Sequence, residues 1–417
     1  MTVETSPRLT AALAAAPTDR VVYDLTGIGE QYDRLVAELP GVRVRFALKA
    51  CPVDEVLSHL AGRGAGFDAA SPAEIAQALA AGADAGRIHY GNTVKSDADI
   101  AEAHRLGIRT YATDSLQDVA AIAAHAPGAR VFCRLATTGE GALWGLNRKF
   151  GCSVDDAVRV LTAARTAGLT PAGLSVHVGS QQMTGEGWQQ ALDLIAETLV
   201  RLGRLGIAPD HVNLGGGLPA LGYLDRRGDP LDPPLDKILT VIREGVDHLR
   251  TLTAGPLGLV MEPGRHLVAD HGAVRAHVYR LTRRRQPDGR EAHWLYLSCG
   301  KFNGLYEMDQ VIHRMLFPGH PAPDGPDDPA YVPAVVAGPT CDSDDAYGGG
   351  THPVRVPRGL ASGDPVWILS AGAYAAGYTT QGFNGIRPLP QTCAPGPGGD
   401  PAPPAPPTPA PAPEERH

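Results

Sequence analysis

The sequence predicts an α/β protein in which a TIM-like (βα)8 barrel is followed by an antiparallel β-sandwich or β-barrel domain. In the first two-thirds of the chain, eight short apolar runs each end in a polar or glycine-rich signature, and helical patterns separate most of them. After Arg265 the pattern changes to short β-rich runs. We therefore expect the barrel at 21–265, the β domain at 266–390 with part of 1–20, and a disordered Pro/Ala-rich tail at 391–417.

The ends of the eight runs carry the residue types that a cofactor site needs. Barrel enzymes perform their chemistry at the carboxyl ends of the strands, so these ends are expected to meet at one rim. One lysine, one histidine, one glycine turn and one acid at that rim indicate a cofactor held as a Schiff base. In chain order the runs are RFALKA with Lys49, GFDAAS with Asp68, IHYGN with Asn92, TYATDS with Asp114, VFCRLA with Arg134, LSVHVGS with His177, VNLGGG with Gly215 to Gly217, and LVMEPGR with Glu262.

Helix boundaries between the runs are well marked. Ser71-Pro72-Ala73-Glu74 is a capping box with proline at the first helical position, and the serine-to-acid spacing recurs at Ser96 and Ser115. Helix ends carry glycine, at Gly82, Gly107 and Gly168. Beyond the barrel, the β-rich runs are AVRAHVYRL, HWLYLS, YVPAVVA and DPVWILS.

Composition excludes several classes of protein. The 417 residues carry a net charge of −8, which argues against a nucleic-acid or anionic-membrane partner. The start of the chain is a poor signal peptide, and no apolar run approaches the roughly 18 residues that span a bilayer, so we expect a cytoplasmic protein. Six scattered cysteines without a CxxC pair predict neither a disulfide framework nor a metal site.

For several candidate residues, an ordinary structural role is the alternative to a role in the site. Lys49 could be an ordinary exposed lysine, but a partly apolar barrel mouth can keep its amine neutral and nucleophilic. The glycine turn at 215–217 offers bare amides for a phosphate, to which Arg265 could add a charged contact. Ser180 and Tyr374 could add hydroxyl donors, although a surface arginine or a core tyrosine is the simpler interpretation.

Three further residues point to carbanion chemistry. A carboxylate such as Glu262 beside a pyridine nitrogen keeps that ring protonated and makes it an electron sink. His177 could stack on the ring, although alone it would be read as a buried core histidine. Cys341 and Asp342, in AGPTCDSDD, form an unusual turn in which the thiol could act as a proton donor.

These residues match a known family. The chain resembles the pyridoxal-phosphate decarboxylases of the ornithine/diaminopimelate group, which share the alanine racemase-like barrel. The resemblance covers roughly residues 21–390 in the family's order, and GPTCD is closer to ornithine than to diaminopimelate decarboxylases. The matching segments are FALKA, GFDAASPAEI, FCRLAT, KFGC, SVHVGSQ, NLGGG, MEPGR, KFNGLYE, GPTCDS, GAY and FNG.

The resemblance implies roles for the site residues. Lys49 would hold pyridoxal 5′-phosphate (PLP) covalently, His177 would stack on its ring and Glu262 would contact its nitrogen. The family forms head-to-tail homodimers with shared active sites, so Cys341 and Asp342 would reach into the partner's barrel. The residues implied to hold the cofactor phosphate are Ser180, Gly217, Gly264, Arg265 and Tyr374, and Gly216 is a further cofactor-binding residue.

The substrate-binding residues also follow from the resemblance. Tyr306 and Glu307 would lie near the substrate tail with Asp342, and Phe383 is a candidate apolar wall. Lys149 looks like a lysine that pairs across the dimer interface with an acid near the cysteine, here Asp345.

The implied activity is decarboxylation of a basic amino acid, with L-ornithine converted to putrescine and CO2. Glu307 stands where ornithine decarboxylases usually have Asp, so 2,4-diaminobutyrate stays open as a substrate, as do lysine and meso-diaminopimelate. A catalytically inactive, regulatory relative is the alternative from another class. A racemase is disfavoured by Glu262 and by the Cys-Asp pair.

Overall fold

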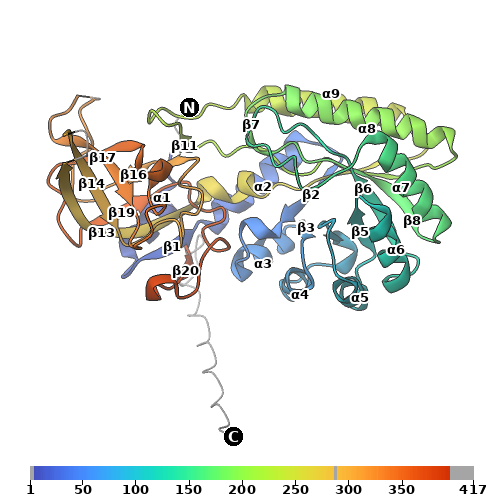
Figure 1. Ribbon diagram of the computed structural model, residues 1–417, viewed down its shortest axis with the longest axis horizontal. Coiled ribbons are helices and arrows are strands. Elements are labelled where there is room, and N and C mark those ends of the chain that lie inside the picture. Colours follow the sequence, from blue (N-terminus) through green and yellow to red (C-terminus); the bar gives the residue numbers. More distant parts are fainter. Residues whose placement is uncertain (1–3, 286–288, 326, 395–417) are drawn as a thin grey trace, which may run out of the picture.

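The computed structural model describes residues 4–285, 289–325 and 327–394. Figure 1 shows two domains side by side: a barrel with its surrounding helices, and a sheet domain built mainly from the last third of the chain. Within the described ranges, no helix is both long and apolar enough to cross a membrane.

Eight parallel strands close the barrel, in the order β10-β12-β2-β3-β4-β5-β6-β8. Each comes from one of the eight apolar runs, so the predicted (βα)8 barrel is confirmed. The barrel strands are β2 (Val42–Ala47), β3 (Gly66–Ala69), β4 (Ile88–Tyr90), β5 (Thr110–Thr113), β6 (Arg130–Arg134), β8 (Thr170–Ser175), β10 (His211–Asn213) and β12 (Gly258–Met261).

The helices around the barrel begin and end at the predicted signals. Ser71 Oγ accepts a hydrogen bond from the Glu74 N–H at 3.2 Å, and Ser96 and Ser115 cap their helices in the same way. The barrel helices are α2 (Leu25–Glu38), α3 (Asp54–Gly62), α4 (Pro72–Ala80), α5 (Asp97–Arg105), α6 (Leu116–His125), α7 (Val154–Thr166), α8 (Glu186–Arg204), α9 (Leu235–Thr251) and the short α10 (Arg265–Val268). Single 3-10 turns are η1 (Leu48–Ala50), η2 (Ala85–Arg87), η3 (Ala269–His271), η4 (Tyr347–Gly350) and η5 (Phe383–Gly385).

The second domain is a mixed sheet, not the purely antiparallel one that the sequence suggested. Its main path runs β16-β19-β13-β14-β17-β18, and the pairs β14–β17 and β1–β20 are parallel. The predicted β-rich runs form β13, β14, β17 and β19. The strands are β1 (Arg20–Tyr23), β13 (Gly272–Arg285), β14 (Glu291–Leu297), β16 (Met315–Leu316), β17 (Tyr331–Ala337), β18 (Pro353–Pro357), β19 (Pro365–Ile368) and β20 (Gln391–Cys393).

Two predicted boundaries need correction: the start of the barrel and the start of the disordered tail. Strand β1 lies beside β13 and β20 in the sheet domain (Figure 1), so residues 20–23 do not belong to the barrel. Strand β20 occupies residues predicted to be disordered, because its backbone pairs with β1; the remainder of the tail, from 395, lies outside the described residues. The helix α1 (Pro7–Ala15) packs Leu9 and Leu13 on this domain, as expected for part of 1–20.

Two short ribbons shape the barrel mouth. The strand β7 (Ala142–Trp144) pairs with β9 (Ser180–Gln182) beside the predicted phosphate site. The strand β11 (Tyr223–Leu224) pairs with β15 (Ile312–His313) and so links a barrel loop to the sheet domain. This second ribbon fixes the segment that carries Glu307 against the mouth.

Candidate active site

A cavity at the carboxyl ends of the barrel strands brings together every residue predicted to bind the cofactor. Five different barrel strands and the sheet domain contribute to it, which no stretch of sequence could show by itself. The lining residues are Ala47, Lys49, Asp68, His177, Ser180, Gly216, Gly217, Leu218, Glu262, Gly264, Arg265 and Tyr374.

Lys49 lies in the 3-10 turn η1, directly after β2, and its side chain reaches solvent through the open mouth. The surrounding protein lowers the pKa of the Lys49 amine, but the carboxyl groups of Asp68 and Glu262 outweigh this effect, so the pKa lies above its ordinary value. The nearby acids therefore favour the charged form of the amine, against the neutral form that an apolar barrel mouth favours.

The two acids are themselves unusual. Asp68 Oδ1 is buried without a hydrogen-bond partner among the described residues, and burial together with Glu262 raises the pKa of Asp68 to about 7. Glu262 Oε1 accepts a hydrogen bond of 2.5 Å from Asn213 Nδ2, while burial raises the pKa of Glu262. Asp68 can therefore exchange protons near neutral pH more readily than a surface acid.

His177 presents a neutral imidazole to the cavity. Burial, helped by Arg134 and Lys49, lowers its pKa well below the ordinary value. Its Nδ1 accepts a hydrogen bond from the Gly179 N–H at 3.1 Å, which leaves the proton on Nε2. A neutral ring held in this way can lie flat against another aromatic ring without adding charge.

Glycines form a cradle that side chains would fill. A Cβ atom on Gly216 would lie 2.8 Å from the Glu262 carbonyl oxygen and 3.4 Å from His177 Nε2. Gly217 has a φ of +124°, and a Cβ on Gly264 would lie 2.7 Å from Ala50 Cβ. The cavity fits an anionic aldehyde cofactor such as PLP. It offers bare glycine amides and Arg265 for an anion, the Lys49 amine for an aldehyde, and the unpartnered Asp68 Oδ1.

Arg265 is buried in this cavity and already paired. Its guanidinium donates two hydrogen bonds to the Glu307 carboxylate, at 2.6 and 2.7 Å, and one to Tyr223 Oη at 2.8 Å. Ser180 Oγ lies 3.3 Å from Nη2, and the rings of Trp144, Tyr223 and Tyr374 surround the group. Glu307 thus lies at the predicted phosphate site, whereas Tyr306 is half exposed with its ring 4.6 Å from that of Tyr378.

Cys341, Asp342 and Phe383 gather elsewhere, on the surface of the sheet domain. The Cys341 N–H donates to Asn384 Oδ1 at 2.8 Å, which ties the thiol to the turn that begins with Phe383. The Phe383 ring lies 4.8 Å from that of Phe302. We call Cys341, Asp342, Phe383 and Asn384 the thiol cluster; none of them lines the Lys49 cavity of its own chain.

Lys149 and Asp345, the pair predicted across the dimer interface, differ in their exposure within one chain. Asp345 is buried, and its carboxylate accepts hydrogen bonds from the N–H groups of Lys301 and Thr340 and from the Thr340 hydroxyl. The Asp345 carboxylate already has three donors in its own chain, and its pair with a partner's lysine stays a prediction. Lys149 is exposed, with its ammonium 4.8 Å from the centre of the Phe150 ring.

Four residues without a predicted role lie at or beside the cavity: Asp68, Arg134, Asn213 and Tyr378. In the sequence, Asp68 and Arg134 stand out as polar ends of barrel strands, and Asn213 carries the same signal. Tyr378, whose ring stacks on that of Tyr374 at 5.1 Å, follows a loop in the sheet domain and had no such signal.

Comparison with known proteins agrees with this geometry. Residues 25–269 match the family model described as pyridoxal-dependent decarboxylase, pyridoxal binding domain. The lysine/ornithine decarboxylase of Selenomonas ruminantium is 30% identical over 89% of this chain and 88% of its own. The diaminopimelate decarboxylase of Pseudomonas fluorescens is 30% identical over 88% and 86%.

Solved structures show the same fold. The crystal structure of lysine decarboxylase from Selenomonas ruminantium matches with a TM-score of 0.80 at 26% identity, covering 94% of this chain and 97% of that one. A structure of SrLDC with PLP and cadaverine matches with a TM-score of 0.79. The barrel match and the similarity along most of the chain show that this protein belongs to the family of pyridoxal-dependent amino acid decarboxylases.

Proposed function

We propose that the protein decarboxylates a basic amino acid, with L-ornithine as the preferred substrate and putrescine and CO2 as the products. The observation that carries the proposal is the convergence of Lys49, the glycine cradle and the acids Asp68 and Glu262 in one cavity. The names of the relatives, which include lysine/ornithine and diaminopimelate decarboxylases, support this substrate class. Lysine, 2,4-diaminobutyrate and meso-diaminopimelate are the competing substrates.

The residues of the cavity would hold PLP in a defined way. The Lys49 amine would anchor it, while the cradle of Gly216 and Gly217 with Ser180 would receive its phosphate. When bound, PLP supplies an electron sink for the pair of electrons released as CO2 departs from the substrate α-carbon. Glu262, positioned by its hydrogen bond from Asn213, keeps a carboxyl group available to hold a proton at a ring nitrogen.

The remaining residues bind the substrate, exclude water and deliver a proton. The neutral His177 and the stacked rings of Tyr374 and Tyr378 exclude water from one side of the cavity, which favours loss of a carboxylate charge. The Cys341 thiol then delivers a proton to the α-carbon, and the Asp342 carboxylate attracts the cationic tail of the substrate. Both groups have to come from a second copy of the chain.

We therefore propose a homodimer with shared active sites. The thiol cluster is exposed and absent from the lining of its own chain's cavity, so one chain holds two half-sites that do not meet. Subunit mixing tests this arrangement. The Lys49→Ala and Cys341→Ala homodimers are each expected to be inactive. When they are mixed and exchange subunits, half of the dimers contain one chain of each kind, and each such dimer has one intact site of two. The mixture should therefore recover roughly a quarter of wild-type activity. No recovery would contradict shared sites.

A substrate panel tests the preferred amino acid. The enzyme with PLP is offered ornithine, lysine, 2,4-diaminobutyrate, meso-diaminopimelate and arginine, and both CO2 release and amine products are measured. Ornithine should show the highest kcat/KM. If ornithine does not react while another amino acid of the panel does, the substrate assignment is overturned, but the assignment of a decarboxylase is not.

We place the activity in polyamine formation in the cytoplasm. Putrescine is itself a diamine, so the proposed product supports a role in polyamine formation. All six cysteines are free thiols, and Cys133 Sγ and Cys152 Sγ form a hydrogen bond of 3.5 Å rather than a disulfide, which suits a reducing compartment.

A further inference from the structure

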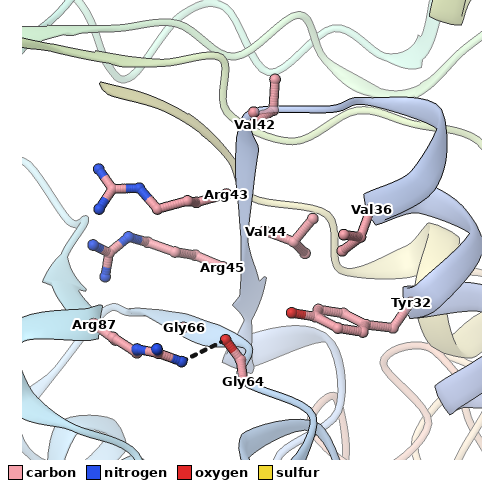
Figure 2. A pocket seen from close by; sticks show the side chains of 10 residues that line it. Tyr32, Val36, Val42, Arg43, Val44, Arg45, Gly64, Gly66 and Arg87 are labelled. Carbon is pink, nitrogen blue, oxygen red and sulfur yellow. Dashed lines mark hydrogen bonds between the residues drawn. The ribbon is translucent and has the colours of Figure 1, made fainter. Parts of the chain in front are cut away.

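A second cavity, of about 410 Å³, opens at the amino-terminal end of the barrel, at the opposite end of the strands from Lys49. In Figure 2, Arg43 and Arg45 project from one side of β2, and Val44 points to the other side, toward Val36 and Tyr32. Tyr32 and Val36 of α2, with Val44 of β2, supply an apolar side. Arg43, Arg45 and Arg87 supply a basic side.

The cavity exists because neighbouring strands differ in length. Strand β2 begins at Val42, whereas β3 begins at Gly66, whose partner is Arg45. The first residues of β2 therefore have β12 on one side and no β3 partner on the other. Gly66 keeps the gap open, since a Cβ there would lie 2.5 Å from the Arg87 carbonyl oxygen and 2.9 Å from Arg45 Cγ.

Arg45 is the unusual residue of the three. It is only 5% exposed, yet its Nε and Nη1 have no hydrogen-bond partner in the described parts of the chain. Burial lowers the pKa of Arg45 to about 10, with Glu262 opposing the effect and Arg43 adding to it. A buried guanidinium without a bonded anion is costly, so a folded protein that keeps one has a partner for it.

The other two arginines are also without carboxylates. Arg43 and Arg87 are exposed at the cavity rim, and among the described residues neither forms an ion pair. Arg87 donates only to the Gly64 carbonyl oxygen, at 2.8 Å. By contrast Arg130, which begins β6 at the same end of the barrel, is paired with Asp210 at 2.5 Å. Three arginines thus line one cavity, and among the described residues none of them forms an ion pair, although the carboxylates of Glu262 and Asp68 act on Arg45 from further away.

We propose that this cavity binds a small organic phosphate, with the phosphate among Arg43, Arg45 and Arg87 and the organic part against Tyr32, Val36 and Val44. Guanidinium groups form bidentate, charge-assisted hydrogen bonds with phosphate oxygens. The apolar wall gives an organic body a surface that a bare phosphate cannot use. This site is separate from the cofactor cavity and lies at the other end of the strands.

Calorimetric titration of the holoenzyme tests the proposal. Bound PLP keeps the cofactor cavity filled, so the probes report on the arginine cavity alone. The probes are phenyl phosphate and inorganic phosphate. We expect one site per chain for each, with phenyl phosphate binding more tightly because its ring meets the apolar wall.

The variant Arg43→Gln/Arg87→Gln removes two exposed charges that lie outside the cofactor cavity. It should weaken phenyl phosphate binding at least tenfold while leaving decarboxylation unchanged. The matched control Arg105→Gln/Arg159→Gln alters the net charge equally, through exposed residues of α5 and α7 that pair within their own helices, and should bind as the wild type does.

Three results would overturn the proposal. One is the absence of saturable binding at millimolar probe. Another is equal weakening in both double variants, which would indicate a general charge effect. The third is equal affinity for the two probes, which would remove the organic part from the assignment.

Discussion

The ion pair of Arg265 with Glu307 predicts a stability change that depends on the cofactor. In the cofactor-free protein, Glu307→Gln removes the carboxylate that neutralises a buried guanidinium, with the two side chains only 4% and 14% exposed. Breaking a buried pair from one side costs about 3 to 5 kcal/mol. The lower end applies, about 3 kcal/mol, because the glutamine oxygen, Tyr223 and Ser180 can still accept from Arg265.

Bound PLP changes the expected magnitude. Its phosphate would give Arg265 a new anionic partner, so the loss caused by Glu307→Gln should shrink to about 1 kcal/mol or less in the holoenzyme. The assay is urea unfolding followed by far-UV circular dichroism, with and without saturating PLP, for both proteins. Glu186→Gln is the matched control, because Glu186 pairs with Lys237 on the surface and both side chains are mostly exposed.

Two outcomes would refute this reasoning. An equal loss of stability with and without PLP would mean that the phosphate does not contact Arg265. No loss in the cofactor-free protein would mean that the Arg265–Glu307 pair does not form in solution. The control should unfold at the wild-type urea concentration in both conditions.

Three more predictions concern single residues. In the cofactor-free protein the folded-state pKa of Asp68, about 7, lies above its unfolded value of about 4, so the folded state holds an extra proton between these pH values. Stability should fall as pH rises through that window, and urea midpoints of Asp68→Asn should show a flatter slope; an unchanged slope would remove Asp68 as the cause. Hydride reduction of the holoenzyme should place the pyridoxyl label on Lys49 by peptide mass spectrometry, and a label on another residue would contradict its assigned role. Ser71→Ala should lower the free energy of unfolding by about 1 kcal/mol through loss of the α4 cap, and a thermal scan without a shift would count against it.

Local patterns were enough to predict the barrel. Each barrel strand is a short apolar run between turn signals, and the caps at Ser71, Ser96 and Ser115 formed as the spacing indicated. These features depend on neighbours within a few residues of one another, so a single chain encodes them directly. The resemblance of FALKA, NLGGG and MEPGR to known motifs then identified the cofactor class.

Pairing between distant segments was not readable in the same way. Strands β1 and β20 lie in the sheet domain because each meets a partner across most of the chain, and a four-residue run such as RVVY carries no record of that partner. The resemblance suggested Asp345 as an interface acid, and the fold adds that backbone N–H groups of Lys301 and Thr340 donate to its buried carboxylate.

The sequence by itself determined the order of strands, the helix caps and the residue types at the barrel rim, because these depend on local spacing. Only the tertiary structure decided that Glu307 meets Arg265, that Asp68 and Glu262 raise the pKa of the Lys49 amine, and that two nitrogens of the buried Arg45 side chain have no hydrogen-bond partner among the described residues. Electrostatic and hydrogen-bond energies depend on distance in space and on burial, and neither quantity exists until the chain has folded.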